Sequence, residues 1–363
     1  MAELLMAKIT LKDLRHSYSA TPAGDDDYAL KRMSLDWADG GAYALLGPSG
    51  CGKTTLLNLI SGLLIPSEGQ ILFDGRDISH TTPEQRNIAQ VFQFPVIYDT
   101  MTVYDNLAFP LRNRGVGEAE VDKRVREIAE MLDLTKTLKN RASGLTADGK
   151  QKISLGRGLV RSDVNVIMFD EPLTVIDPHL KWQLRSKLKE LHQRIRRTMI
   201  YVTHDQTEAL TFADQVVVMK DGEVVQTGTP IDLFERPMHT FVGHFIGSPG
   251  MNVLPCEVRG GKASFAGHPI GTVNARNYKG KGQKLELGVR PEFVNFAKKG
   301  IPVDIVKVAD AGRYRIVETR VANSSIKLLV PEGDSIPEGK AHLSFDASRA
   351  QIYENGWMVG ARP

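Results

Sequence analysis

Apolar and polar positions follow two different patterns along this chain. Through about residue 245, short continuous apolar runs such as Ala42–Leu46 alternate with longer segments whose apolar residues recur at helical spacing. Continuous apolar strands are typical of parallel sheets that helices cover on both faces. This pattern therefore predicts an α/β domain, 1–245, built on a mostly parallel sheet.

The expected strands of this domain are residues 9–14, 42–46, 71–73, 88–92, 164–169, 198–203 and 215–220. Asp74-Gly75 follows the third of these strands and predicts a hairpin turn. Helices are expected at 55–62, 153–160 and 205–213, and residues 102–161 are predicted to form a helical subdomain. Within it, residues 118–134 predict an amphipathic helix whose apolar face consists of Val121, Val125, Ile128, Ala129 and Leu132.

A different pattern begins after Gly247-Ser248-Pro249-Gly250. Short β-like runs at 285–289, 301–308, 313–321 and 326–330 are separated by Gly, Pro and Asn. Such spacing is typical of a small barrel or sandwich. We therefore expect a second, all-β domain at 246–363, with the boundary near residue 245.

Composition narrows the class of protein. The chain has 363 residues, 42% of them hydrophobic and 25% charged, which is ordinary for a globular protein of two domains. A net charge of +3 does not by itself indicate nucleic acid, and two distant cysteines predict no disulfide framework or zinc site. The start of the chain lacks the pattern of a secretory signal, and no apolar run approaches the ~18 residues of a membrane helix. Any membrane role is therefore expected to be peripheral.

The most informative motif lies between the strand at 42–46 and the helix after it. It is a glycine-rich phosphate-binding loop that consists of Gly47, Pro48, Ser49, Gly50, Cys51, Gly52, Lys53, Thr54 and Thr55. Its glycines let backbone N–H groups turn toward phosphates, and the helix N-terminus adds positive potential. Lys53 can reach the terminal phosphates and Thr54 can place a hydroxyl on Mg²⁺. A chance glycine-rich turn does not explain the order strand, loop, helix, so the chain is predicted to bind a nucleoside triphosphate.

Further polar residues follow other expected strands. Asp170 and Glu171 come after the strand at 164–169, and Gln93 and His204 follow two more, at the sheet edge where α/β proteins place ligands. Tyr18 can stack a base on its ring. Taken singly, Tyr18 is also consistent with ordinary packing, His204 with a helix cap, and the acidic pair with a solvated strand end. Their common order around one phosphate loop favours the functional interpretation.

These residues together resemble the ATPase subunit of an ABC transporter. The resemblance rests on Tyr18, the loop from Gly47 to Thr55, Val91-Phe92-Gln93, Asp170-Glu171-Pro172-Leu173, Asp177 and Thr203-His204-Asp205. The tail, through 241–252 and Gly288-Val289-Arg290-Pro291-Glu292, resembles the carbohydrate-importer branch, which carries a C-terminal OB-like domain. The resemblance covers nearly the whole chain and is loosest after residue 300.

The resemblance implies a P-loop ATPase domain with a helical subdomain, ATP and Mg²⁺ as ligands, and a role for each motif. Lys53 and the loop amides would hold phosphates, Thr54 and Gln93 would contact Mg²⁺, and Asp170 would bind it through water. Glu171 would be the general base, His204 would sense the γ-phosphate, and Asp177 would lie at a dimer interface. Residues 94–103 would touch one of two membrane permeases at the cytoplasmic face of the bacterial inner membrane, with a periplasmic substrate-binding protein as an indirect partner.

One motif departs from the family. The signature Leu-Ser-Gly-Gly-Gln is replaced by Leu145-Thr146-Ala147-Asp148-Gly149. The resemblance implies that this segment contacts the γ-phosphate of the ATP bound to the partner protomer. A carboxylate about 4 Å from a phosphate charge costs on the order of 4 kcal/mol at an effective dielectric near 20. Asp148 is also expected to compete by capping the helix; the alternative is that it turns to solvent and leaves the site working.

The D-loop also departs, since Thr174-Val175-Ile176-Asp177 replaces the small polar run usual in the family. The two departures suggest that the partner is a second, different ATPase subunit in an asymmetric heterodimer. The sequence of residues 92–102, together with the altered signature, resembles that of ATPase subunits of bacterial glycerol importers. Glycerol or a related polyol is therefore the expected cargo. Other sugars and glycerol phosphate remain alternatives.

Two other classes of function are alternatives to a transporter ATPase. A soluble ABC protein of DNA repair or translation would carry a coiled-coil insertion or a second cassette, and this chain has neither. A regulatory ATPase whose C-terminal domain binds a cytosolic partner remains an alternative. No nucleic-acid partner is expected, because the tail aromatics do not alternate with a basic stripe and are predicted to be core: Phe265, Tyr278, Phe293 and Phe296.

Overall fold

The chain folds into two compact units in a computed structural model that describes residues 8–161, 163–259, 262–272 and 285–360. The first unit comprises residues 1–230 and the second residues 231–363. Residues 231–245, which the apolar pattern assigned to the first domain, pack with the second unit.

The central sheet of the first unit has the strand order β10-β9-β3-β8-β7-β6. Its strands are β3 (Ala42–Leu46), β6 (Ile88–Val91), β7 (Val166–Asp170), β8 (Thr198–Thr203), β9 (Gln215–Lys220) and β10 (Glu223–Gly228). All pairs are parallel except β9 with β10. All residues of β3 and β7 are buried, which explains why their sequences are apolar throughout, apart from Asp170 at the end of β7. The predicted mostly parallel sheet is confirmed.

An antiparallel sheet completes the strand layer of this unit, in the order β2-β1-β4-β5. It contains β1 (Ile9–Ser17), β2 (Tyr28–Trp37), β4 (Glu68–Phe73) and β5 (Arg76–Asp77). The predicted hairpin at Asp74-Gly75 joins β4 to β5, and both turn residues have positive φ, 50° and 80°. Such values suit the mirror-image turns that match the twist of hairpin strands.

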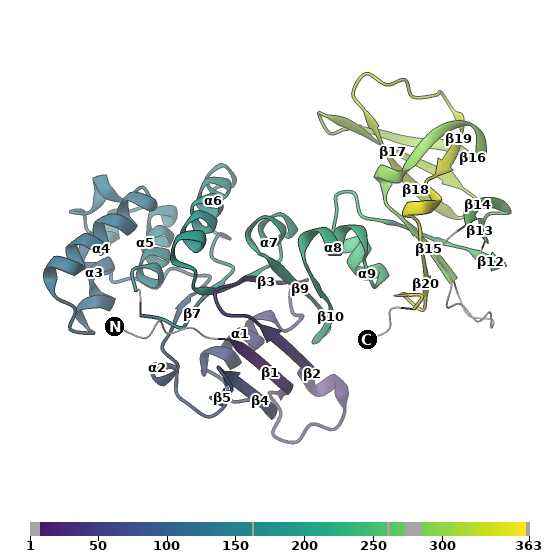
Figure 1. The fold of residues 1–363 in the computed structure, drawn as a ribbon. Coiled ribbons are helices and arrows are strands. Elements are labelled where there is room, and N and C mark those ends of the chain that lie inside the picture. The colour runs from purple at the N-terminus through teal and green to yellow at the C-terminus, as the bar shows by residue number, and fades with distance from the viewer. Residues whose placement is uncertain (1–7, 162, 260–261, 273–284, 361–363) are drawn as a thin grey trace. The chain divides into compact units, whose positions relative to one another are not determined.

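Helices surround these sheets. They are α1 (Lys53–Ser61), α2 (Pro83–Arg86), α3 (Val103–Arg112), α4 (Glu118–Met131), α5 (Ala147–Leu159), α6 (Pro178–Ile195) and α7 (Gln206–Phe212). The expected helical subdomain consists of α3, α4 and α5, which lie side by side at one end of the unit (Figure 1). The face predicted for α4 is buried as expected. α2 and α6 are additional to the helices expected from the pattern.

The second unit begins with two short helices, α8 (Pro230–Glu235) and α9 (Thr240–Phe245), and continues as β-structure. Its sheets have the orders β11-β15-β20-β21, β12-β13-β14 and β18-β17-β16-β19. The strands are β11 (Asn252–Pro255), β12 (Glu257–Arg259), β13 (Lys262–Phe265), β14 (His268–Thr272), β15 (Leu285–Val289), β16 (Val294–Asp310), β17 (Tyr314–Val321), β18 (Ser324–Pro331), β19 (Lys340–Phe345), β20 (Gln351–Glu354) and β21 (Trp357–Met358). The predicted all-β character is confirmed. Phe265 lies in the core and Phe293 and Phe296 pack against it, whereas Tyr278 lies outside the described residues.

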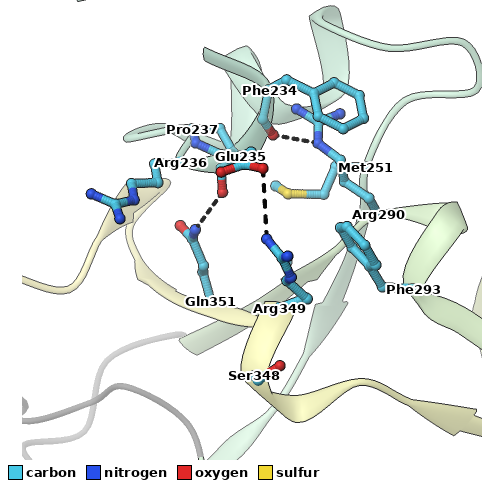
Figure 2. Close-up of a pocket in the computed structure, with 11 residues that line it drawn as sticks. Phe234, Glu235, Arg236, Pro237, Met251, Arg290, Phe293, Ser348, Arg349 and Gln351 are labelled. Carbon is cyan, nitrogen blue, oxygen red and sulfur yellow. Dashed lines mark hydrogen bonds and ion pairs between the residues drawn. The ribbon is translucent and has the colours of Figure 1, made fainter. Parts of the chain in front are cut away.

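Arg290 joins α8 and α9 to the β-structure of this unit. Arg290 is 3% exposed, and its guanidinium donates hydrogen bonds to carbonyls at the ends of both helices: Leu233 at 3.4 Å, Phe234 at 2.6 Å, Gly243 at 3.4 Å and Ile246 at 2.6 Å. A cation at two helix C-termini satisfies carbonyls that have no partner within the helix. Figure 2 shows Arg290 beside Phe234, and Arg349 and Gln351 both directed toward Glu235. These contacts explain why residues 231–245 belong to the second unit.

Candidate active site

The glycine-rich loop sits between β3 and α1 in the first unit. α1 begins at Lys53, two residues before the predicted start, and no side chain caps its N-terminus, where Gly52 adopts φ 98°. The first N–H groups of α1 therefore face the loop. A Cβ on Gly47 would lie 2.3 Å from the carbonyl oxygen of Met219, so the first position of the loop accommodates only glycine.

Lys53 lies inside this loop. Its ammonium donates hydrogen bonds to the carbonyl oxygens of Gly47 at 2.8 Å and Pro48 at 2.9 Å. The Cys51 sulfur is 3.8 Å from the same nitrogen, and burial raises the pKa of the Cys51 thiol above its ordinary value. The thiol is therefore neutral, and Lys53 supplies the positive charge of the loop.

The acidic pair stands at the end of β7, across from the loop. The Thr54 hydroxyl donates to a carboxylate oxygen of Asp170 at 3.2 Å, and Asp170 is only 8% exposed. Burial raises the pKa of Asp170, the hydrogen bond from Thr54 opposes that shift, and the neighbouring charge of Glu171 adds to it. A buried carboxylate beside a hydroxyl has the chemistry of a magnesium site.

Glu171 has an unusual backbone. Its φ is 44°, a left-handed conformation that non-glycine residues seldom adopt and that tends to occur at functional sites. Nδ1 of His204 lies 3.1 Å from a carboxylate oxygen of Glu171. Asp205, rather than His204, caps α7 by accepting from the N–H groups of Thr207 and Glu208. The interpretation of His204 as a helix cap is therefore wrong, and the partly buried Glu171 is not a solvated strand end.

A cavity of about 410 Å³ brings most of the predicted residues together. It is lined by Tyr18, Ala29, Ser49, Gly50, Gly52, Lys53, Thr54, Thr55, Gln93 and Glu171. Tyr18 is 65% exposed and its hydroxyl lies 3.1 Å from that of Thr55, so Tyr18 is not a core residue. Ala29, on β2, is a lining residue that no sequence signal identified.

The altered signature lies outside the lining of this cavity, at the start of α5. The helix begins at Ala147, not at Ile153 as predicted, because the Thr146 hydroxyl accepts from the Gly149 N–H at 3.3 Å and caps it. The expectation that Asp148 caps the helix is wrong. One carboxylate oxygen of Asp148 instead lies 3.5 Å from the Lys152 ammonium.

Asp177 also lies outside the cavity lining, directly before α6. Its carboxylate accepts from the His179 N–H at 2.9 Å and caps that helix. One further polar residue escaped sequence reasoning: Gln151 on α5 is fully buried. The only sequence feature that could have pointed to Gln151 is its position just after the altered signature, residues 145–149.

Across the described ranges, no group of three His, Cys, Asp or Glu side chains gathers as a self-contained metal site. The predicted magnesium contacts use one carboxylate with Thr54 and Gln93, so they do not require such a group. In the same part of the chain, no helix is long and apolar enough to span a membrane.

The loop between β3 and α1, with the acidic pair at the end of β7, defines a P-loop nucleotide-binding protein. Residues 30–174 match the ABC transporter family and residues 247–294 match the MalK OB fold domain. The chain belongs to the ATP-binding subunits of ABC transporters, in the carbohydrate-importer branch, and is an ATPase coupled to transport.

Similar proteins cover most of its length. The sn-glycerol-3-phosphate import ATP-binding protein UgpC of Jannaschia sp. (strain CCS1) is 35% identical over 96% of this chain and 98% of its own. UgpC 3 of Rhizobium johnstonii is 43% identical over 74% of this chain and 75% of its own. Among solved structures, cbiO1 from Clostridium perfringens, part of the ABC transporter complex cbiONQ, is 28% identical with a TM-score of 0.57, covering 63% of this chain and 90% of that one.

Proposed function

We propose that this chain hydrolyses MgATP in the cavity around Lys53 to drive import of sn-glycerol-3-phosphate or a closely related phosphorylated polyol. The proposal of ATP hydrolysis rests on one observation: Lys53, Thr54 and Glu171 all line the same cavity. The names of these relatives support the cargo. They favour glycerol phosphate, the alternative weighed from the sequence, over glycerol.

The loop and Tyr18 hold the nucleotide in this proposal. The amides of the loop and the first turn of α1 bind the phosphates, and the Lys53 ammonium exchanges its carbonyl partners for phosphate oxygens. The exposed ring of Tyr18 offers its face to the base.

The side chains that the proposal assigns to magnesium are chemically suited to bind this ion. The Thr54 hydroxyl and the Asp170 carboxylate are 3.2 Å apart, and Gln93 and Thr54 both line the cavity. Bound there, Mg²⁺ supplies neutralisation of the phosphate charge. Thr54 and Gln93 would contact the ion, and Asp170 would hold it through water.

Glu171 is assigned the role of general base. Its carboxylate lines the cavity, where it can orient a water for attack on the terminal phosphate and accept its proton. His204, at 3.1 Å from Glu171, lies where it can hydrogen-bond both the carboxylate and that phosphate.

Glu171→Gln tests this assignment, since it keeps size and removes the proton acceptor. We expect turnover to fall by roughly a hundredfold or more while ATP still binds. The matched control is Glu190→Gln, at an exposed position of α6 in the same unit, which should leave turnover unchanged. Full turnover in Glu171→Gln would contradict the assignment.

An exposed apolar strip follows the strand β6, in the region predicted to meet a permease. Phe92, Phe94, Val96 and Tyr98 are exposed by 38%, 71%, 53% and 40%. A cavity of about 270 Å³ beside them is lined in part by Arg157 and Arg161. We propose that a membrane permease docks here, which places the chain peripherally at the cytoplasmic face of the bacterial inner membrane, with a periplasmic binding protein as an indirect partner.

We further propose that residues 146–149 and Asp177 face a second ATP-binding protomer. The comparisons give no support to the expectation that this protomer is a different ATPase chain. Native mass spectrometry of Glu171→Gln with MgATP decides between the two: a dimer of this chain alone contradicts the heterodimer, and a monomer that dimerises only with a co-expressed ATPase supports it.

Uptake measurements test the cargo. Cells that depend on this transporter should accumulate labelled sn-glycerol-3-phosphate when the chain is intact and lose that uptake with Glu171→Gln. Uptake of glycerol but not of its phosphate would overturn the proposed cargo and leave the ATPase assignment standing.

A further inference from the structure

Gln151 lies in the second turn of α5 and touches two segments that are distant in sequence. Its side-chain amide nitrogen donates to the carbonyl oxygen of Pro172 at 2.8 Å and to that of Phe92 at 3.4 Å. Phe92 directly precedes Gln93, and Pro172 directly follows Glu171. A single side chain thus links the peptide before one proposed site residue to the peptide after another.

The chemistry of the contacts fixes which way the amide points. Both partners are carbonyl oxygens, so only the NH₂ end of the amide can face them. Its two hydrogens match the two acceptors. The link is therefore specific to a side chain that carries two donors on one nitrogen.

Stability alone does not explain a glutamine here. The residue is 0% exposed, and its carbonyl oxygen has no hydrogen-bond partner among the described residues. A buried polar atom without a partner costs about 1–3 kcal/mol. Methionine, similar in shape, would avoid that cost but could not hold the two carbonyls.

We propose that Gln151 is a positioning residue for ATP hydrolysis. It holds the backbone on either side of the cavity so that Gln93 and Glu171 keep a fixed separation, and it ties both to the start of α5, where residues 146–149 lie. It does not line the nucleotide cavity, so it acts on turnover rather than on nucleotide binding. This inference rests on the site roles proposed above.

Gln151→Met in the full-length chain tests it through steady-state ATPase kinetics. Because small displacements of reacting groups are costly, we expect kcat to fall roughly ten- to a hundredfold, with KM for ATP changed by less than about twofold. The control is Asn165→Leu, which removes another amide donor, 3.0 Å from the carbonyl oxygen of Arg86; Asn165 directly precedes β7 and does not line the cavity. It should change kcat by less than about twofold.

A double-mutant cycle distinguishes positioning from general destabilisation. If Gln151 acts through Gln93, adding Gln151→Met to Gln93→Ala should cost much less than it costs in the parent chain. The inference is overturned if Gln151→Met keeps its parent kcat, if Asn165→Leu loses as much, or if the two losses multiply fully. Unchanged turnover in Glu171→Gln would instead overturn the proposed function on which the inference rests.

Discussion

Removing the charge of Asp148 should make this ATPase faster. The carboxylate stands in the first turn of α5, where Thr146 already caps the helix, so helix formation does not require it. One of its oxygens lies 3.5 Å from the Lys152 ammonium, and the other is buried without a partner among the described residues. In the proposed dimer, a phosphate of the partner protomer approaches this helix start.

The magnitude follows from the competing charges. Two unit charges about 4 Å apart interact by roughly 4 kcal/mol at an effective dielectric near 20. Lys152 offsets part of this repulsion, and the remaining exposure of Asp148 screens more of it. About 1.4 kcal/mol or more should remain, which corresponds to a tenfold effect on closure over ATP.

Asp148→Asn and Asp148→Gly should therefore raise kcat/KM for ATP by about tenfold in the purified dimer. Asn keeps the side-chain volume, so it isolates the charge from the space. The gain should shrink at high salt, because screening already weakens the repulsion in the parent chain. Parent-like kinetics in Asp148→Asn at low salt would refute the reasoning and indicate that the carboxylate stays clear of the phosphate.

Two further predictions concern the buried ionisable groups. Arg290→Met should leave the carbonyl groups at the ends of α8 and α9 without hydrogen-bond partners. Backbone amides of residues 240–254 should then exchange hydrogen roughly a hundredfold faster, while exchange in residues 42–62 stays unchanged. Equal protection from exchange in mutant and parent would refute the role of Arg290. Since burial raises the pKa of Asp170, the folded state binds its proton more tightly than the unfolded state, and the ionised carboxylate costs stability at neutral pH. Asp170→Asn should therefore raise the thermal midpoint at neutral pH and abolish magnesium-dependent hydrolysis. The difference in midpoint between mutant and parent should fade as pH falls through the folded pKa of Asp170 toward ~4. A lower midpoint in Asp170→Asn at neutral pH would contradict the destabilising effect of the ionised carboxylate.

Local patterns were sufficient for the elements that position the nucleotide. The strand β3, the glycine loop and α1 are adjacent in sequence, and each has a signal of its own: a continuous apolar run, glycines at fixed spacing, and helical periodicity. The hairpin at Asp74-Gly75 is similarly local. For the same reason the two-part fold class was predictable from the change of pattern after residue 247.

Contacts between distant residues could not be read in this way. Nothing near Arg290 in sequence indicates that its guanidinium reaches carbonyls 44 to 57 residues away, although these contacts assign α8 and α9 to the second unit. The proposed role of Gln151 likewise depends on its contacts with Phe92 and Pro172, which are distant from it in sequence. The start of α5 lies before the predicted Ile153 because the hydroxyl of Thr146 caps the helix at Ala147, ahead of its first large apolar residue.

The central claim is that Lys53 and the surrounding loop amides hold the phosphates of ATP. Equilibrium binding of MgATP to the parent chain and to Lys53→Ala tests it most directly, because Lys53 is the only cationic side chain among the residues that line the cavity. We expect the substitution to weaken binding by at least about tenfold and to abolish hydrolysis, with the thermal midpoint of the second unit unchanged. Undiminished ATP affinity and turnover in Lys53→Ala would contradict the account.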